Sequence, residues 1–124
     1  MKPILIVEDN DKNLKLLRDV LQFKGYATVE ANTATEGLRL AREASPALIL
    51  MDIQLPDFDG ITALAQLRAD PSTRDVPVFA VSASAMPDAQ ERIIASGFQA
   101  YITKPIDIKS FVATVERFVS IQTD

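Results

Sequence analysis

The sequence predicts an α/β fold in which five strands and five helices alternate and build a doubly wound, five-stranded parallel sheet. Two observations predict it. Short runs of residues are apolar throughout, rather than at every second position, which suits strands buried on both faces of a parallel sheet. Stretches with helical periodicity lie between these runs, and right-handed crossovers would place such helices on both faces of the sheet. The 124 residues have room for one hydrophobic core, so 1–124 is expected to be a single domain.

Five strands and five helices are expected, in strict alternation. The strongest strand candidates are dense in Ile, Leu and Val, and they are Pro3–Val7, Ala47–Met51 and Val76–Val81. Two weaker strand candidates are Tyr26–Glu30 and Ala100–Thr103. The expected helices are Asp11–Lys24, Ala34–Ala44, Ile61–Ala69, Asp88–Ser96 and Ile108–Val119.

Start and stop signals stand at the ends of these helices. Gly25 and Gly97 follow the first and fourth helices, where a C-terminal glycine is common. Thr33 and Glu36 have the spacing of a capping box for the second helix. Asp107 is placed to cap the last helix.

The composition excludes several classes of function. The chain has neither cysteine nor histidine, so chemistry must use carboxylates, hydroxyls, lysine or a hard cation with oxygen ligands. A net charge of −4 argues against nucleic-acid binding, which needs clustered Lys and Arg. The apolar runs are too short to span a membrane, and the N-terminus has no signal-peptide pattern. A soluble cytoplasmic protein is expected.

Polar residues capable of chemistry follow four of the strands. Glu8 and Asp9 follow the first strand, Asp52 the third, Ser82 the fourth and Lys104 the fifth. Ligands of open α/β sheets bind at the carboxyl ends of the strands, where the strand order reverses. If the first and third strands are neighbours, three carboxylates crowd one edge of the sheet.

Such crowding raises the pKa of one or more of the carboxyl groups unless a cation lies among them. One divalent ion together with Lys104 would balance the three negative charges of Glu8, Asp9 and Asp52. Oxygen ligands alone favour Mg²⁺ or Mn²⁺. Mg²⁺ also pairs with phosphate oxygens, so the pattern favours a site of phosphoryl transfer.

Each acidic residue also has a simpler interpretation. Asn10 or Asp11 is expected to cap the first helix, and Asp57 and Asp59 suit turn and cap roles in the loop after the third strand. Only the coincidence of acids after two strands with Ser82 and Lys104 after two others favours a site.

Four segments, in matching order, resemble the response regulator receiver family over the whole chain. They are Ile4-Leu-Ile-Val-Glu8-Asp9-Asn10, Leu48-Ile-Leu-Met-Asp52-Ile-Gln-Leu-Pro56-Asp-Phe-Asp-Gly60, Val81-Ser82-Ala83 and Tyr101-Ile-Thr-Lys104-Pro105. The resemblance implies a flavodoxin-like (βα)5 fold with strand order 2-1-3-4-5.

The resemblance also implies roles for the site residues. Asp52 would be the phosphoacceptor, and Mg²⁺ would be held by Asp52, by Asp9 directly, by Glu8 chiefly through water and by the backbone carbonyl of Gln54. Lys104 would contact the phosphoryl oxygens, and its peptide bond to proline is expected to be cis.

A switch is implied by the same resemblance. Ser82, where the family more often has threonine, would turn toward the phosphoryl group, and Tyr101 would then turn inward. The output surface would be the fourth helix, fifth strand and fifth helix, with Arg92 and Gln99 among its candidate residues.

The implied function is that of a single-domain response regulator in a two-component phosphorelay. A sensor histidine kinase or a histidine phosphotransfer protein would phosphorylate Asp52, and a downstream protein would bind the phosphorylated face. Only Mg²⁺-dependent self-phosphorylation and autodephosphorylation are expected, so the chain would not be an enzyme in the usual sense. Neither nucleic acid nor membrane is expected as a partner.

The first helix carries a broad apolar stripe centred near Leu17 and Val20, with Leu14 and Phe23 at its edges. Leu14 lies one turn from the acidic residues and would suit docking of a histidine-bearing helix. Packing into the core is an equally good interpretation.

Three other interpretations make different demands on the sequence. A phosphatase of the haloacid dehalogenase type would need an Asp at the position of Gln54. A flavodoxin-like electron carrier would need a glycine- and hydroxyl-rich loop after the first strand, where this chain has Glu8-Asp-Asn-Asp11. A receiver domain excised from a larger hybrid kinase or response regulator stays open as an alternative.

Overall fold

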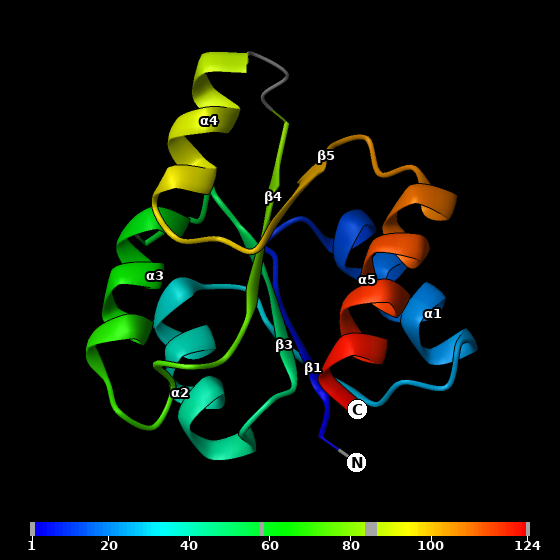
Figure 1. The fold of residues 1–124 in the computed structure, drawn as a ribbon, viewed down its shortest axis with the longest axis horizontal. Helices are drawn as coiled ribbons and strands as arrows, with labels where there is room; N and C mark the ends of the chain where they lie inside the picture. Colours follow the sequence, from blue (N-terminus) through cyan, green and yellow to red (C-terminus); the bar gives the residue numbers. More distant parts are fainter. Residues whose placement is uncertain (1, 58, 84–86, 124) are drawn as a thin grey trace.

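The structure, a computed structural model, describes residues 2–57, 59–83 and 87–123, with side chains of the last helix described as far as Val119. Figure 1 shows a sheet viewed nearly edge-on between two layers of helices. The strands are β1 (Ile4–Val7), β2 (Thr28–Ala31), β3 (Leu48–Asp52), β4 (Val78–Ser82) and β5 (Ala100–Thr103). The helices are α1 (Asp11–Phe23), α2 (Ala34–Ala44), α3 (Gly60–Ala69), α4 (Pro87–Ala95) and α5 (Ile108–Thr123). Within the described ranges, no helix combines the length and the apolar character needed to cross a membrane.

All strand pairs are parallel, and the strand order is β2-β1-β3-β4-β5. The predicted fold class and strand order are therefore confirmed. In the register, Val7 lies beside Met51, and Asp52 lies beside Val81. The carboxyl ends of the three central strands consequently meet at one edge of the sheet.

The sheet separates two hydrophobic cores. Side chains alternate along a strand, so in β1 Ile4 and Ile6 belong to one core, while Leu5 and Val7 belong to the other. α1 and α5 cover the first core, and α2, α3 and α4 cover the second (Figure 1). Burial on both faces explains why the strands β1, β3 and β4 have uninterrupted apolar sequences.

The predicted elements agree with the structure to within two residues at their starts. The prediction for β2 was two residues early, because the Tyr26 N–H donates to the carbonyl of Leu21 at 3.0 Å and so still belongs to the end of α1. Gly25, with φ +93°, makes the turn between the two elements. β3 and β4 each extend one residue further than predicted, so Asp52 and Ser82 are the last residues of their strands.

Most predicted caps are present, with one difference. Asn10 accepts a hydrogen bond from the Asn13 N–H and caps α1. Thr33 caps α2 by accepting from the Glu36 N–H at 3.1 Å. The Glu36 carboxylate, however, accepts from Arg39 instead of completing a capping box, because the ion pair one turn along the helix satisfies it.

α2 packs unusually close to β1, at Gly37. A Cβ atom at this position would lie 2.8 Å and 3.0 Å from the two methyl groups of Val7, closer than side chains normally approach. Glycine therefore permits the contact, and the contact places α2 directly beside β1, the strand that ends at Val7 just before Glu8.

Substituting Gly37 by alanine is expected to destabilise the protein, although alanine is usually favoured over glycine inside a helix by about 1 kcal/mol. Overpacking against Val7 should instead lower the free energy of unfolding by about 1–2 kcal/mol. In a Val7→Ala background the same substitution should cost markedly less, as urea unfolding of all four variants would measure. A stability gain for Gly37→Ala in the wild-type background would contradict the close packing.

Candidate functional site

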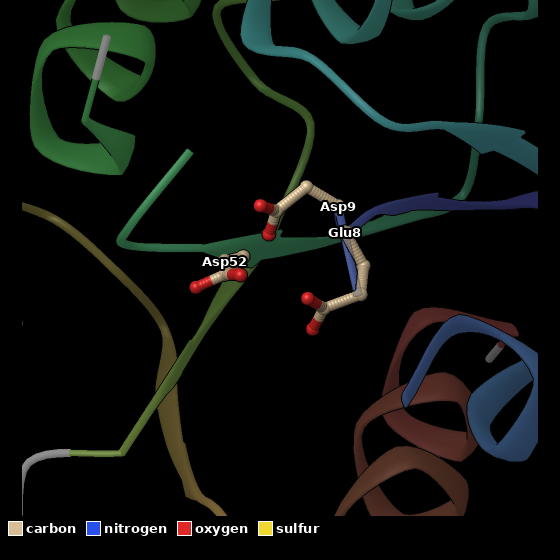
Figure 2. A group of neighbouring side chains, drawn as sticks. All are labelled: Glu8, Asp9 and Asp52. Atoms are coloured by element: carbon tan, nitrogen blue, oxygen red, sulfur yellow. The ribbon is translucent and has the colours of Figure 1, made fainter. Parts of the chain in front are cut away.

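Three carboxylates converge beyond the carboxyl ends of β1 and β3 (Figure 2). Glu8 and Asp9 follow β1 and extend in different directions, and Asp52 ends β3. Each offers an oxygen atom such that all three atoms lie within 4.8 Å of one another. Glu8 and Asp52 are buried, at 1% and 3% exposure, whereas Asp9 is exposed. The acidic cluster predicted at this edge is thus formed in the structure.

Lys104 reaches this cluster from the far side of β4. Its Nζ lies 3.1 Å from Asp52 Oδ2 and 3.0 Å from Glu8 Oε1. The Lys104 N–H donates to the carbonyl of Ser82 at 2.9 Å, which continues the pairing of β5 with β4 past Thr103. The peptide bond between Lys104 and Pro105 is cis, as the resemblance implied. The fifth strand therefore supplies the positive charge of the site.

The electrostatics of the cluster are unbalanced without a further cation. Burial, and next the contact with Asp52, raise the pKa of Glu8 to about 7, although hydrogen bonds from Lys104 and the Asn10 N–H act in the opposite direction. Burial alone would lower the pKa of Lys104, but its contacts with Glu8 and Asp52 outweigh this effect and raise it. One ammonium group therefore does not neutralise the site.

The chemistry of these residues fits a hard divalent cation. Glu8 Oε1 is buried and accepts no hydrogen bond from the described residues, and the Lys104 Nζ lies 3.0 Å from it as an ion pair. A buried carboxylate oxygen without a hydrogen bond is costly, and a cation or its water shell would satisfy it. The side-chain donors are oxygen atoms of carboxylates, which is the ligand type that Mg²⁺ prefers.

The loop after β3 holds the Asp52 carboxylate in place. The Gln54 N–H donates to Asp52 Oδ1 at 3.0 Å, and Gln54 itself is exposed. The Gly60 N–H donates to the Ile53 carbonyl at 2.8 Å, which brings the start of α3 against the strand end. A Cβ atom on Gly60 would lie 2.8 Å from the Asp52 carbonyl oxygen, so glycine is needed for this approach. Asp59 caps α3 through the Thr62 N–H, as predicted for this loop.

Ser82 and Tyr101 lie on neighbouring strands, as the switch hypothesis requires. Ser82 is buried and lies one residue beyond Val81, the partner of Asp52 in the register. Tyr101 is partly buried, packs against the core beneath α2, α3 and α4, and lines a shallow hollow with residues of α4. Residues 84–86, which connect β4 to α4, lie outside the described residues.

Two residues singled out for partner binding have structural contacts. The Gln99 side-chain oxygen accepts from the Val78 N–H at 2.8 Å and from Arg68 at 3.2 Å, so Gln99 joins β4, β5 and α3. Leu14 is partly buried against the core beneath α1 and α5, and it also lines a hollow with Glu30 and the start of α2. Arg92 is exposed on α4.

Asp57 has a partner that sequence analysis did not find. Its carboxylate accepts hydrogen bonds from the first two N–H groups of α2, at Ala34 and Thr35. The cap role was predicted, but for an unspecified helix, and the helix that Asp57 caps begins 23 residues before it. Only the general preference of Asp for helix N-termini could have indicated it.

Comparisons with known proteins agree with one another. Residues 4–116 match the model of the response regulator receiver domain. The polar-differentiation response regulator DivK of Brucella ovis is 45% identical over 118 residues, which cover 95% of this chain and 96% of that protein. The receiver domain of a Pseudomonas aeruginosa sensor histidine kinase was solved with a magnesium ion coordinated in its active site cleft. It superposes with a TM-score of 0.87 at 29% identity, and the match covers 96% of this chain and 98% of that chain. A CheY-like receiver domain protein of Methanospirillum hungatei has a TM-score of 0.88 at 28% identity and covers 99% of this chain and 97% of its own.

The stability of the metal-free protein is expected to fall as the pH rises from 5 to 8. Folded Glu8 keeps its proton up to a pKa of about 7, whereas unfolded Glu8 loses it near its ordinary pKa of 4.5. The folded state thus binds more protons in this interval, and its advantage is lost as the pH rises through 7. The loss attributable to Glu8 is on the order of 2 kcal/mol. Urea unfolding with a chelator present, for wild type and Glu8→Gln, would measure it as the difference between the two pH profiles; parallel profiles would contradict the raised pKa.

Proposed function

The chain belongs to the response regulator receiver family of two-component signalling, and we propose that Asp52 is its phosphoacceptor. The observation that carries this proposal is the ion pair of Asp52 with Lys104, made beside Glu8 and Asp9 at the open edge of the sheet. Asp52 is buried enough to be held in one orientation, through the Gln54 N–H, yet it ends its strand at the edge where ligands of such sheets bind.

Mg²⁺ is the cofactor that we assign to this site. Asp9 and Asp52 would bind it directly, Glu8 chiefly through water, and Gln54 through its backbone carbonyl. The oxygen-only donor set and the unsatisfied oxygen of Glu8 support this assignment. The magnesium ion in the receiver domain of the Pseudomonas aeruginosa kinase supports it as well, because the two folds superpose over nearly their whole lengths.

The reaction would move a phosphoryl group from the phosphohistidine of a sensor histidine kinase or a histidine phosphotransfer protein to Asp52. An oxygen of the Asp52 carboxylate forms a bond to phosphorus as the bond between phosphorus and the donor nitrogen breaks, and the histidine regains a proton. Mg²⁺, when bound, would offset the charge of the phosphoryl oxygens. Lys104, which pairs with Asp52 in the structure, can follow that charge to a phosphoryl oxygen because its long side chain is only partly buried. Attack of water on the acyl phosphate would later release phosphate, so the chain would catalyse only its own phosphorylation and dephosphorylation.

Signalling would follow from a change at Ser82 and Tyr101. A phosphoryl group on Asp52 adds strong acceptor oxygens one register position from Ser82. If the Ser82 hydroxyl turns toward them, the ring of Tyr101 can turn inward from the hollow that it lines beside α4. The surface of α4, β5 and α5 would then bind a downstream protein in the phosphorylated state only.

We infer that the chain acts as a single-domain response regulator, which the match over 96% of its DivK relative supports, and we propose the cytoplasm as its location. The alternative is that it serves as the receiver domain of a larger hybrid kinase or response regulator. The match with a receiver domain from a sensor histidine kinase is consistent with that alternative. The gene neighbourhood and the native reading frame distinguish the two.

Incubation with acetyl phosphate is expected to add one phosphoryl group to the wild-type protein only when Mg²⁺ is present. Asp52→Asn should remain unmodified, because its amide cannot form the acyl phosphate. Intact-mass spectrometry measures both, and Asp59→Asn is a matched control from the same loop. Labelling that persists in Asp52→Asn would show that another residue is the phosphoacceptor.

Replacing Ser82 by alanine is expected to leave phosphorylation of Asp52 possible but to weaken binding of the activated-state partner by about tenfold or more. The loss follows because one hydrogen bond to a charged group is removed, which is worth about 1.5–3 kcal/mol. Affinity of phosphorylated wild type and Ser82→Ala for the same downstream protein would test this. Equal affinities would mean that the switch runs through other residues.

A further inference from the structure

Asp57 ties the loop after β3 to the N-terminus of α2. Its Oδ1 accepts from the Ala34 N–H at 2.9 Å, and its Oδ2 accepts from the Thr35 N–H at 2.8 Å and from the Thr35 hydroxyl at 2.6 Å. We call this set of three hydrogen bonds the Asp57 clasp. The hydrogen bonds, first of all that from the Thr35 hydroxyl, hold the pKa of Asp57 far below its usual range, so the carboxylate is charged at neutral pH.

The clasp exceeds what α2 needs for local capping. Thr33 already occupies the N-cap position and accepts from the Glu36 N–H. The N–H groups of Ala34 and Thr35, in the first turn, still need acceptors. Water could accept from the Thr35 N–H, because Thr35 is exposed. A carboxylate from 22 residues further along the chain takes them instead. The contact therefore joins the loop after β3 to the first turn of α2.

The α2 end of the clasp is rigidly attached to β1. Ala34 is fully buried in the core beneath α2, α3 and α4. Gly37, one turn along, lies so close to Val7 that even a methyl group would not fit. Val7 directly precedes Glu8 and Asp9. The N-terminus of α2 is thus a fixed point relative to the β1 side of the site.

The other end of the clasp belongs to the loop that adjoins Asp52. Ile53 is fixed by backbone hydrogen bonds to Val81 and Gly60. Gln54 comes next, and its N–H holds the Asp52 carboxylate. Asp57 anchors the chain three residues further on, so the segment that contains Gln54 runs between two anchored positions.

We propose that the Asp57 clasp positions Gln54 and Asp52 relative to Asp9, and so pre-organises the site for a divalent cation. This rests on the proposed function, because it takes the same site to bind Mg²⁺. Asp57 itself touches neither the cation nor the phosphoryl group, so it is a positioning residue. The Asp57 clasp and the contact between Gly37 and Val7 connect the β3 side of the site to the β1 side through α2, in addition to the strand pairing of the sheet.

The coupling is reciprocal, since any cation that binds the ordered loop more tightly also stabilises the clasp. Mg²⁺ should therefore slow hydrogen exchange of the Ala34 and Thr35 amides, although neither residue is a ligand. A clasp that serves only as a helix cap would not respond to the cation in this way. The Mg²⁺ dependence of hydrogen exchange at Ala34 and Thr35 therefore distinguishes a positioning role of Asp57 from a purely structural one.

The test compares Asp57→Ala with Thr33→Ala. Both remove a cap from the same turn of α2, but Thr33 has its capping bond within the helix and does not hold the loop. Titration calorimetry with MgCl₂ should give about tenfold weaker binding for Asp57→Ala, at the lower end of the losses seen for outer-shell partners of metal ligands. Thr33→Ala should bind as wild type does, and Asp9→Ala should lose most of the binding. Urea unfolding without metal would establish that the two cap variants are similarly destabilised.

Milder variants keep the test usable if Asp57→Ala folds poorly. Thr35→Ala removes only the hydroxyl of the clasp and should weaken Mg²⁺ binding less than Asp57→Ala. Asp57→Asn removes the charge but keeps an acceptor oxygen, so it should lie between Asp57→Ala and wild type. If Asp57→Asn and Asp57→Ala lose the same Mg²⁺ affinity, and high salt abolishes the loss, the effect is one of charge alone and the proposal is overturned.

The remaining outcomes separate this inference from the proposed function. Equal Mg²⁺ affinities of Asp57→Ala, Thr33→Ala and wild type would overturn the clasp proposal and leave the metal site intact. Failure of wild type to bind Mg²⁺ at all would overturn both. Both would be supported if Mg²⁺ increases the hydrogen-exchange protection of the Ala34 and Thr35 amides in wild type. The Thr35 amide should respond in the same way in Thr33→Ala, and neither amide should respond in Asp57→Ala.

Discussion

The Lys104 ammonium lies between the buried carboxylates of Glu8 and Asp52, about equally far from each. Removing two carboxylates from water side by side is unfavourable, and one ammonium offsets only part of the cost. Burial, and next the neighbouring Asp52, raise the pKa of Glu8, and its Oε1 accepts no hydrogen bond from the described residues. The site therefore has the charge to accept a further cation, and Lys104 bridges the two carboxylates in the structure.

The sheet order makes this ion pair possible. β1 and β3 are neighbours in the sheet, and the helices that follow them, α1 and α3, lie on opposite faces (Figure 1). Such a junction is where open α/β sheets leave a crevice. β4 lies between β3 and β5, so Lys104 has to reach across one strand to Asp52. A long side chain that extends along apolar surface suits that distance, and a shorter cationic residue would not.

The parts of this architecture that depend on local sequence were predictable, and those that depend on distant contacts were not. Strands buried on both faces must be apolar throughout, so β1, β3 and β4 could be recognised and the residues after them placed at one edge. The start of β2 was missed, because Tyr26 bonds back to α1. The partners of Asp57 and Gln99 lie more than 20 residues away, and a single sequence does not contain the pairing. The metal ligands and the switch stay predictions from the family resemblance.

Ser82 and Lys104 lie on the side of Asp52, the proposed phosphoacceptor, that faces away from β1, and they precede the two helices of the proposed output surface. Ser82 ends β4 and precedes the connection to α4, while Lys104 follows β5 and precedes α5. The Lys104 N–H also bonds the Ser82 carbonyl, so these two connections start from one shared hydrogen bond. A phosphoryl group on Asp52 would draw the Lys104 ammonium and the Ser82 hydroxyl toward the same oxygens. Since a charge on Asp52 acts first on these two residues, α4, β5 and α5 are the elements best placed to respond, whereas α2 is held by the Asp57 clasp.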